Sequence, residues 1–163
     1  MGLLKKKHQN WMKKALNEAE VAFEEGEIPV GAVIVHDDEI IGRGHNQRET
    51  LEDPTAHAEI LAITSAATSL GDWRLEECRM YVTLEPCSHF GKTPPCSDLI
   101  IDRKIPNIVI GTIDPFAKVA GMGVKKLLSA GRNVSIGVCE DECEELNKRF
   151  FTFHRKKRPY IIL

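Results

Sequence analysis

The chain has 163 residues, of which 42% are apolar and 28% charged, and its formal net charge is −2. This length suits one domain with a single core, and the near-neutral charge shows no overall bias toward polyanionic partners. No apolar run approaches the roughly 20 residues of a membrane-spanning helix, and residues 1–7 do not resemble a secretory signal. Five cysteines, an odd number, argue against a disulfide framework. We therefore expect a cytoplasmic protein, not associated with a membrane, whose cysteines bind metal or lie in the core.

Basic residues are concentrated at the two ends of the chain. Eleven of the 22 lysines and arginines lie within residues 5–14 and 148–158, and neither terminal segment contains an acidic residue. If the fold brings the ends together, they form one basic patch that could bind phosphates or RNA. If it does not, they are two solvated tails.

The first half of the chain predicts a helix, a hairpin and a second helix. Residues 8–25 carry apolar side chains at helical spacing, and Gly26 ends this helix. An apolar, β-branched strand over residues 30–35 turns at Asp37-Asp38 into a second strand over residues 39–42.

The next helix is expected over residues 56–70, after Asp53-Pro54-Thr55 and before Gly71, with Asp53 or Thr55 as its cap. In the second half, strands and helices continue to alternate. The predicted strands cover residues 80–84, 107–112 and 134–138, and the predicted helices cover residues 96–103, 123–130 and 140–150. A final strand-like segment, residues 159–163, has no evident partner. This alternation predicts a three-layer α/β domain with a mainly parallel half.

Two segments carry residues suited to metal chemistry. His57 and Glu59 fall in the first turn of a predicted helix, and Cys87 and Cys96 each follow a proline. We expect each sulfur to lie near a helix N-terminus, where the thiol pKa is lowered. One imidazole and two thiolates supply three ligands for Zn²⁺ and leave its fourth tetrahedral position to water, which is typical of a catalytic site.

The order of these residues is typical of zinc deaminases, in which His-x-Glu precedes Pro-Cys-x-x-Cys and the glutamate is the general acid and base. Here eight residues rather than two separate the cysteines. Zinc lowers the pKa of a water toward about 7. Glu59 would take a proton from this water, so that hydroxide attacks the ring carbon that bears the amine, and would return protons to a ring nitrogen and to the departing ammonia. The reaction is hydrolytic deamination of an aromatic heterocycle.

Other interpretations of these residues stay open at this point. A lone His-x-Glu is common, and isolated cysteines are often small buried side chains. A zinc-stabilised binding module would need a fourth ligand, for which His89 lies between the cysteines, and would leave Glu59 idle. The remaining cysteines, Cys78, Cys139 and Cys143, are expected to be structural.

The second half of the chain resembles the deaminase domain of the bifunctional riboflavin biosynthesis enzymes, in the cytidine deaminase-like superfamily. The motifs are residues 83–96 (TLEPCSHFGKTPPC), Asp114-Pro115 and residues 119–123. The resemblance implies a three-layer α/β/α cytidine deaminase-like fold with a central mixed five-stranded sheet. It also implies that Lys92 and Thr93 contact a substrate phosphate, with His89 on the same loop. On this basis, residues 1–150 form the zinc-dependent deaminase domain and the basic tail 151–163 resembles the start of a connector to a reductase domain.

The first half of the chain is more similar to the bacterial tRNA adenosine deaminases. The matching segments are residues 26–35, 44–46 and 53–62, and the resemblance implies that Asn46 and Ala58 contact the substrate base. Each branch also lacks one of its usual motifs here. The riboflavin branch usually carries Asn-Pro where this chain has Ile28-Pro29, and the Pro-Cys-x-x-Cys of the tRNA branch is missing.

We therefore expect a hydrolytic deaminase of an amino-substituted nucleobase ring. The favoured substrate is the phosphoribosylated diaminopyrimidine of riboflavin biosynthesis, because the loop that differs between the branches adjoins the metal. The alternatives are adenosine-to-inosine deamination of tRNA and deamination of another nucleobase or nucleotide. The partners expected are thus a small nucleotide, tRNA as a possible substrate, and further copies of the chain, since the resemblance implies a homodimer or higher homo-oligomer.

Overall fold

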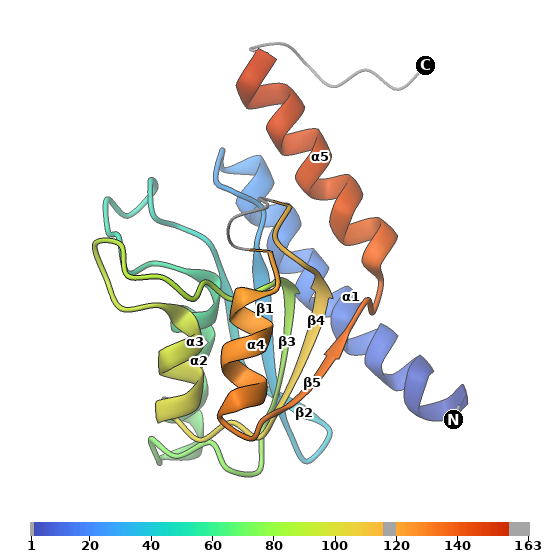
Figure 1. The fold of residues 1–163 in the computed structure, drawn as a ribbon, viewed down its shortest axis with the longest axis vertical. Helices are drawn as coiled ribbons and strands as arrows, with labels where there is room; N and C mark the ends of the chain where they lie inside the picture. The colour runs from blue at the N-terminus through green and yellow to red at the C-terminus, as the bar shows by residue number, and fades with distance from the viewer. Residues whose placement is uncertain (1, 116–119, 157–163) are drawn as a thin grey trace.

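The computed structural model describes residues 2–115 and 120–156, which form a sheet covered by helices on both faces (Figure 1). The elements in chain order are α1 (Gly2–Glu24), β1 (Gly31–His36), β2 (Glu39–His45), α2 (Ala58–Leu70), β3 (Arg79–Leu84), α3 (Cys96–Asp102), β4 (Asn107–Thr112), α4 (Met122–Ser129), β5 (Asn133–Ile136) and α5 (Glu140–Lys156). The strand order is β2-β1-β3-β4-β5. Strand β1 pairs antiparallel with β2 and β3, whereas β3, β4 and β5 are parallel. The predicted mixed five-stranded sheet is confirmed.

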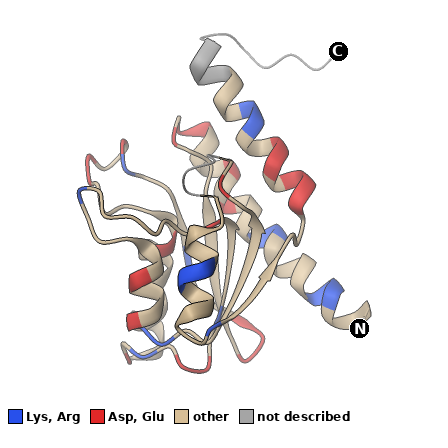
Figure 2. Cartoon of the chain, in the orientation of Figure 1, with Lys and Arg blue, Asp and Glu red and all other residues tan. Residues whose placement is uncertain are grey.

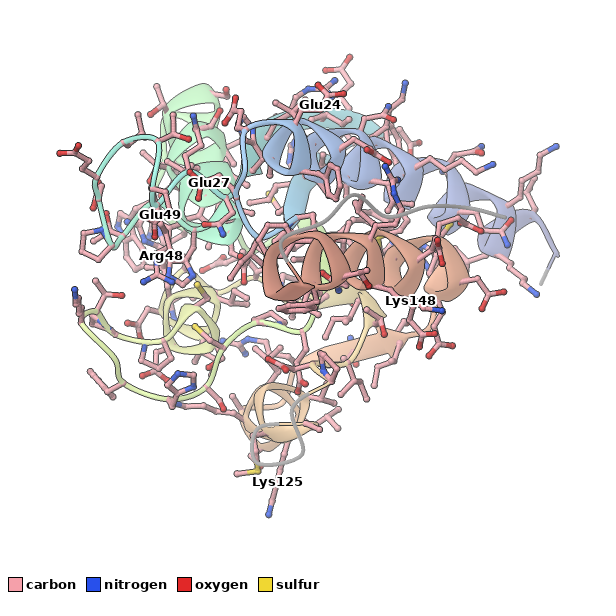
Figure 3. All side chains as sticks on the ribbon, turned by 90° about the horizontal axis from the view of Figure 1, so that it is seen from above. Glu24, Glu27, Arg48, Glu49, Lys125 and Lys148 are labelled. Atoms are coloured by element: carbon pink, nitrogen blue, oxygen red, sulfur yellow. The ribbon has the colours of Figure 1, made fainter. Side chains whose placement is uncertain are left out.

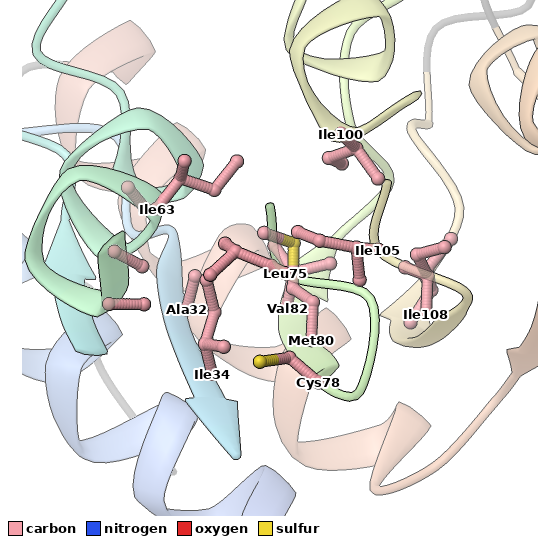
Figure 4. Close-up of a cluster of buried hydrophobic side chains, with 14 of the residues drawn as sticks. Ala32, Ile34, Ile63, Leu75, Cys78, Met80, Val82, Ile100, Ile105 and Ile108 are labelled. Atoms are coloured by element: carbon pink, nitrogen blue, oxygen red, sulfur yellow. The ribbon is translucent and has the colours of Figure 1, made fainter. Parts of the chain in front are cut away.

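Alternating side chains of the central strands divide the core between the two faces of the sheet. In β1, Ala32 and Ile34 pack with α2, whereas Val33 and Val35 pack with α1 and α5. Figure 4 shows Ala32 and Ile34 in the first of these clusters, opposite Ile63 of α2. Helices α2, α3 and α4 therefore cover one face and α1 and α5 the other, which confirms the three-layer arrangement.

Glycines in β2 allow the backbone of α2 to approach the sheet closely. A Cβ atom on Gly44 would lie 2.3 Å from the carbonyl oxygen of Ala58, and one on Gly42 would lie 2.3 Å from that of Ala62. Overlap of this size is prohibitive against backbone, so both positions require glycine. This contact fixes the first turn of α2, which carries the predicted catalytic residues, against the end of β2.

Several predicted boundaries differ from the structure. Helix α1 begins at Gly2 rather than residue 8, and α5 continues to Lys156 rather than ending at residue 150. The predicted cap of α2 is wrong: the helix begins at Ala58 with His57 as its N-cap, and no side chain caps it. The Asp53 carboxylate instead accepts hydrogen bonds from the backbone N–H and the hydroxyl of Thr55, at 2.8 and 2.7 Å, which close a local turn before the helix. The expected final strand, residues 159–163, lies outside the described residues.

The lysines at the start of α1 lie far from Arg149 of the C-terminal basic segment. Near its C-terminal end, α1 packs against α5: the rings of Phe23 and Phe150 are 6.5 Å apart, and Arg149 forms an ion pair with Glu20 at 3.5 Å. Residues 5–7 lie more than four turns away along α1, about 25 Å at 1.5 Å per residue (Figure 2). Within the described ranges, no helix is long and apolar enough to cross a membrane.

Candidate functional site

A cavity of about 280 Å³ opens where several elements end or begin. It lies at the carboxyl ends of β3 and β4, the usual position of ligand sites in sheets of this kind, and the start of α2 forms another wall. Its lining residues are Ile28, Val30, Asn46, Arg48, Pro54, His57, Ala58, Glu59, Leu84, Glu85, Cys87, His89, Gly91, Lys92, Thr93 and Asp114. The predicted base-contacting, catalytic and loop residues thus share one cavity.

Three side chains at this cavity are arranged to hold a metal ion. His57 precedes α2, Cys87 follows β3 and Cys96 is the first residue of α3, and their ligand atoms all lie within 4.8 Å of one another. The carbonyl of Pro54 acts on the His57 ring and opposes the lowering of its pKa. A ligating histidine usually has such a carbonyl at one ring nitrogen and the metal at the other. Burial, first, and the charge of Arg48 lower the pKa of His57, which favours the neutral imidazole that a metal requires.

Both cysteines lie near the N-terminus of α3, but they reach it in different ways. Cys96 is the first residue of α3, whereas Cys87 lies in an irregular segment after β3. The N–H of Cys96, in the first turn of α3, donates to the Cys87 sulfur at 3.2 Å, and the N–H of Ser97 donates to the Cys87 carbonyl at 3.1 Å. Cys87 is therefore near a helix N-terminus in space although no helix follows it in sequence.

The ionisation of this pair fits a bound dication. Hydrogen bonds from the side chain and backbone of Cys96 lower the pKa of the Cys87 thiol to about 6. The hydrogen bond to Cys87 and burial raise the pKa of Cys96. The first thiolate forms readily, and a second beside it needs a compensating positive charge. Zn²⁺ between two thiolates and an imidazole supplies that charge, so this donor set fits zinc.

Among the described residues, these three side chains make the one cluster with metal-ligand spacing. His89, the candidate fourth ligand of a structural zinc site, is exposed on the loop at the cavity and does not belong to the cluster. Three protein ligands with a fourth position open to the cavity are typical of a catalytic zinc site. The geometry therefore favours the catalytic interpretation over the zinc-stabilised binding module.

Glu59 lies in the first turn of α2 and is only 4% exposed. Burial, first, and the charge of Cys87 raise the pKa of Glu59 to about 8. A carboxyl group in this environment can hold and release a proton near neutral pH, which is what a proton shuttle requires. Ala58 beside it is fully buried and lines the same cavity.

Asn46 presents an unused hydrogen-bonding atom to the cavity. The residue is 6% exposed, and its Nδ2 donates to the carbonyl of Ile28 at 3.3 Å. Its Oδ1 is buried and has no partner among the described residues. An unsatisfied buried carbonyl oxygen costs about 1–3 kcal/mol, which a ligand N–H can recover. On the opposite side, Lys92 is exposed and Thr93 half-buried on the loop between the cysteines.

Two residues that position the site carry no individual signal in the sequence. Glu27 is 1% exposed, and its carboxylate accepts hydrogen bonds from the N–H of Glu49 at 3.2 Å and from the N–H and hydroxyl of Thr50 at 2.6 and 2.7 Å. These bonds hold the turn that begins at Arg48, a cavity residue that sequence reasoning missed (Figure 3). Only the tertiary fold brings residue 27 to residue 50.

Glu85 performs the same task on the other side of the cavity. It is 5% exposed; its Oε1 accepts from the N–H groups of Asp114 and Gly121 at 3.2 and 2.9 Å, and its Oε2 accepts from the N–H of Val124 at 2.9 Å. A carboxylate is stabilised at a helix N-terminus, here that of α4. Glu85 therefore ties the residues just before Cys87 to the start of α4.

Comparisons with known proteins agree with this geometry. Residues 5–112 match the family described as the cytidine and deoxycytidylate deaminase zinc-binding region. The chain is 41% identical over 157 residues to the riboflavin biosynthesis protein RibD of Aquifex aeolicus, covering 95% of this chain but 42% of that protein. It is also 41% identical over 152 residues to the tRNA-specific adenosine deaminase of Bacillus subtilis, covering 91% of each.

A solved structure shows the same sequence identity to this chain. The diaminohydroxyphosphoribosylaminopyrimidine deaminase/5-amino-6-(5-phosphoribosylamino)uracil reductase of Thermotoga maritima superposes with a TM-score of 0.80 at 41% identity, covering 96% of this chain and 43% of that one. The chain thus spans less than half the length of the riboflavin proteins that it matches. With the family match over about two thirds of its residues, the chain belongs to the zinc-binding cytidine and deoxycytidylate deaminase family, and the His57, Cys87 and Cys96 cluster is suited to the metal of that family.

Proposed function

We propose that the chain deaminates a ribosylaminopyrimidine 5′-phosphate, the substrate class named for its riboflavin-type relatives. The observation that carries this proposal is the eight-residue segment between Cys87 and Cys96. Four of its residues, His89, Gly91, Lys92 and Thr93, line the cavity beside the zinc ligands. An exposed ammonium group at this position is suited to an anionic group on the substrate.

Catalysis by this chain needs a base, an orienting contact and a metal. His57, Cys87 and Cys96 would hold zinc, which would lower the pKa of a water molecule at the site. Glu59 accepts one proton from the attacking water and delivers it to the ring nitrogen, and then carries the second proton from the new hydroxyl group to the departing amine. The ring gains a carbonyl oxygen and loses ammonia. Asn46 orients the ring by accepting a hydrogen bond through its free Oδ1.

The decisive measurement is kcat/KM of the zinc-loaded chain on three substrates side by side: the pyrimidine nucleotide, an anticodon stem-loop, and free nucleosides and bases. We expect the pyrimidine nucleotide to exceed the others by at least tenfold. The Glu59→Gln variant serves as the matched inactive control for each substrate. Preference for the stem-loop or for an unphosphorylated base would refute the assignment.

A second candidate is deamination of adenosine in tRNA. Asn46 supports it, since the resemblance of the first half of the chain to tRNA adenosine deaminases includes this residue, and the tRNA-specific relative matches over nearly its whole length. A nucleic acid substrate calls for a continuous basic surface. Residues 5–7 lie apart from Arg149 along α1, so these residues do not form one patch by themselves. Binding of the stem-loop that weakens steeply with salt would favour this candidate.

We also propose that the chain acts in the cytoplasm as a homo-oligomer. All five thiols are free, which suits a reducing compartment. Large exposed apolar side chains, Phe90 and Trp73 among them, are of the kind that subunit interfaces bury. Light scattering coupled to size-exclusion chromatography tests the oligomer, and a monomer at micromolar concentration would refute it.

A further inference from the structure

Two cationic side chains reach the cavity from different walls. Arg48 comes from the segment between β2 and α2, and Lys92 comes from the loop between the cysteines. Neither forms a hydrogen bond or an ion pair with another described residue, and the Nε atom of Arg48 is buried without a partner. A buried guanidinium nitrogen without a partner is costly, so this arrangement calls for an anion from outside the chain.

The backbone that carries Arg48 is held in place. The turn that follows it is bound to the buried carboxylate of Glu27 by three hydrogen bonds from Glu49 and Thr50. Figure 3 shows Glu27, Arg48 and Glu49 together at the left of the molecule, while Lys125 projects from the bottom of the view. The backbone of Arg48 is thus fixed beside the cavity, which lowers part of the entropic cost of binding a ligand.

The acidic residues of the cavity do not neutralise these cations. Glu59 is buried next to the zinc ligands, and Glu85 accepts three backbone hydrogen bonds at the start of α4. Asp114 donates its backbone N–H to Glu85 and lies at the end of β4, on the wall of α4 rather than of Arg48. Outside the cavity lining, Glu27 is close enough to Arg48 that, against the effect of burial, hydrogen bonds from Thr50 and Glu49 and then the charge of Arg48 lower the pKa of Glu27. Arg48 and Lys92 are the two cationic residues of the described cavity lining.

We infer that Arg48 and Lys92 together bind the phosphate of the substrate, and that Arg48 is a specificity-determining residue for phosphorylated substrates. This inference rests on the proposed function and deepens it. A phosphomonoester carries close to two negative charges at neutral pH, which one guanidinium and one ammonium balance. The planar fork of arginine contacts two phosphate oxygens, and lysine acts as a point charge on a third.

The test compares a ribosylaminopyrimidine 5′-phosphate with its dephosphorylated form in zinc-loaded variants. Arg48→Met and Lys92→Met remove one charge each at nearly constant length. We expect each to lower kcat/KM for the phosphorylated substrate tenfold to a hundredfold and to leave the dephosphorylated substrate within twofold. The double variant should lose less than the product of the two single losses, because both residues bind the same group.

Matched controls separate this effect from a general loss of charge. Arg43→Met and Lys125→Met make the same substitutions at exposed positions outside the cavity, and both should match the wild type. Turnover of the dephosphorylated substrate reports that each variant is folded. Equal losses on both substrates in Arg48→Met would overturn the inference, since Arg48 would then shape the pocket or contact the base. Arg48→Lys should restore part of the loss if charge is what matters.

Binding of ribose 5-phosphate, measured by calorimetry, tests the same pair independently of turnover. We expect affinity to fall at least fivefold in Arg48→Met and in Lys92→Met and to stay unchanged in the two controls. If the wild type turns over neither pyrimidine, the proposed function fails, and the calorimetric comparison still decides whether this pair binds phosphate. Equal affinity in the wild type and both cavity variants would overturn the inference.

Discussion

Replacing Glu85 by glutamine tests whether its buried carboxylate ties the zinc loop to the rest of the fold. The carboxylate accepts two N–H groups on one oxygen and one N–H on the other. A glutamine can keep its carbonyl oxygen toward Asp114 and Gly121 and must then direct its NH₂ group at the N–H of Val124. One charge-assisted hydrogen bond, worth about 1.5–3 kcal/mol, is lost, and a buried N–H group is left without an acceptor.

We therefore expect Glu85→Gln to lower the free energy of unfolding by about 2–4 kcal/mol and Glu85→Ala by more. For a chain of this length the corresponding drop in Tm is roughly 5–15 °C. Urea unfolding of the zinc-loaded protein measures the change, with the exposed Glu76→Gln as the matched control. A Glu85→Gln protein within 0.5 kcal/mol of the wild type would show that the three hydrogen bonds contribute little, and the proposed tie between loop and helix would be refuted.

Three further predictions concern the metal, the base and pH. Cys96→Ala should reduce bound zinc from one per chain to a small fraction by elemental analysis, whereas Cys78→Ala should retain it; full occupancy in Cys96→Ala would exclude that thiol as a ligand. Glu59→Gln should keep zinc and lose activity by 10²-fold or more, because an amide cannot shuttle protons; turnover within tenfold of the wild type would contradict this role. Burial, and then the charge of Arg79, lower the pKa of His8 in the folded chain below its ordinary 6.5. The unfolded chain then binds more protons below about pH 6.5, so stability should fall as pH drops toward 5, with a shallower slope in His8→Phe; identical slopes in urea unfolding would refute this.

The layers of the fold were predictable from local patterns. The uninterrupted apolar run over residues 32–35 requires burial on both faces, and the structure places β1 inside the sheet. By contrast, β5 is a short, largely exposed strand at the edge. The candidate zinc ligands were also predictable, because the types of these residues and their order along the chain define the pattern.

The parts that could not be predicted depend on contacts between distant segments. Glu27 meets Thr50, and Asn46 meets Ile28, only after α1 has packed on the sheet. The helix N-terminus expected near Cys87 is that of α3, which the fold brings to this thiol, since Cys87 itself lies in an irregular segment. Boundary errors in α1 and α5 arose where polar, charged residues continue a helix beyond its apolar face.

The two hydrogen bonds between Cys87 and the start of α3 have a consequence for how this family diversifies. They join the base of the loop directly, from the N–H of Cys96 to the sulfur of Cys87 and from the N–H of Ser97 to its carbonyl. These bonds hold the two thiolates together independently of residues 88–95, so a loop of another length can connect them. Changing the length of such a loop costs little closure entropy. Replacing this segment would change one wall of the substrate cavity while the zinc ligands and Glu59 stayed in place. The same property makes the segment a natural grafting point for redirecting the enzyme.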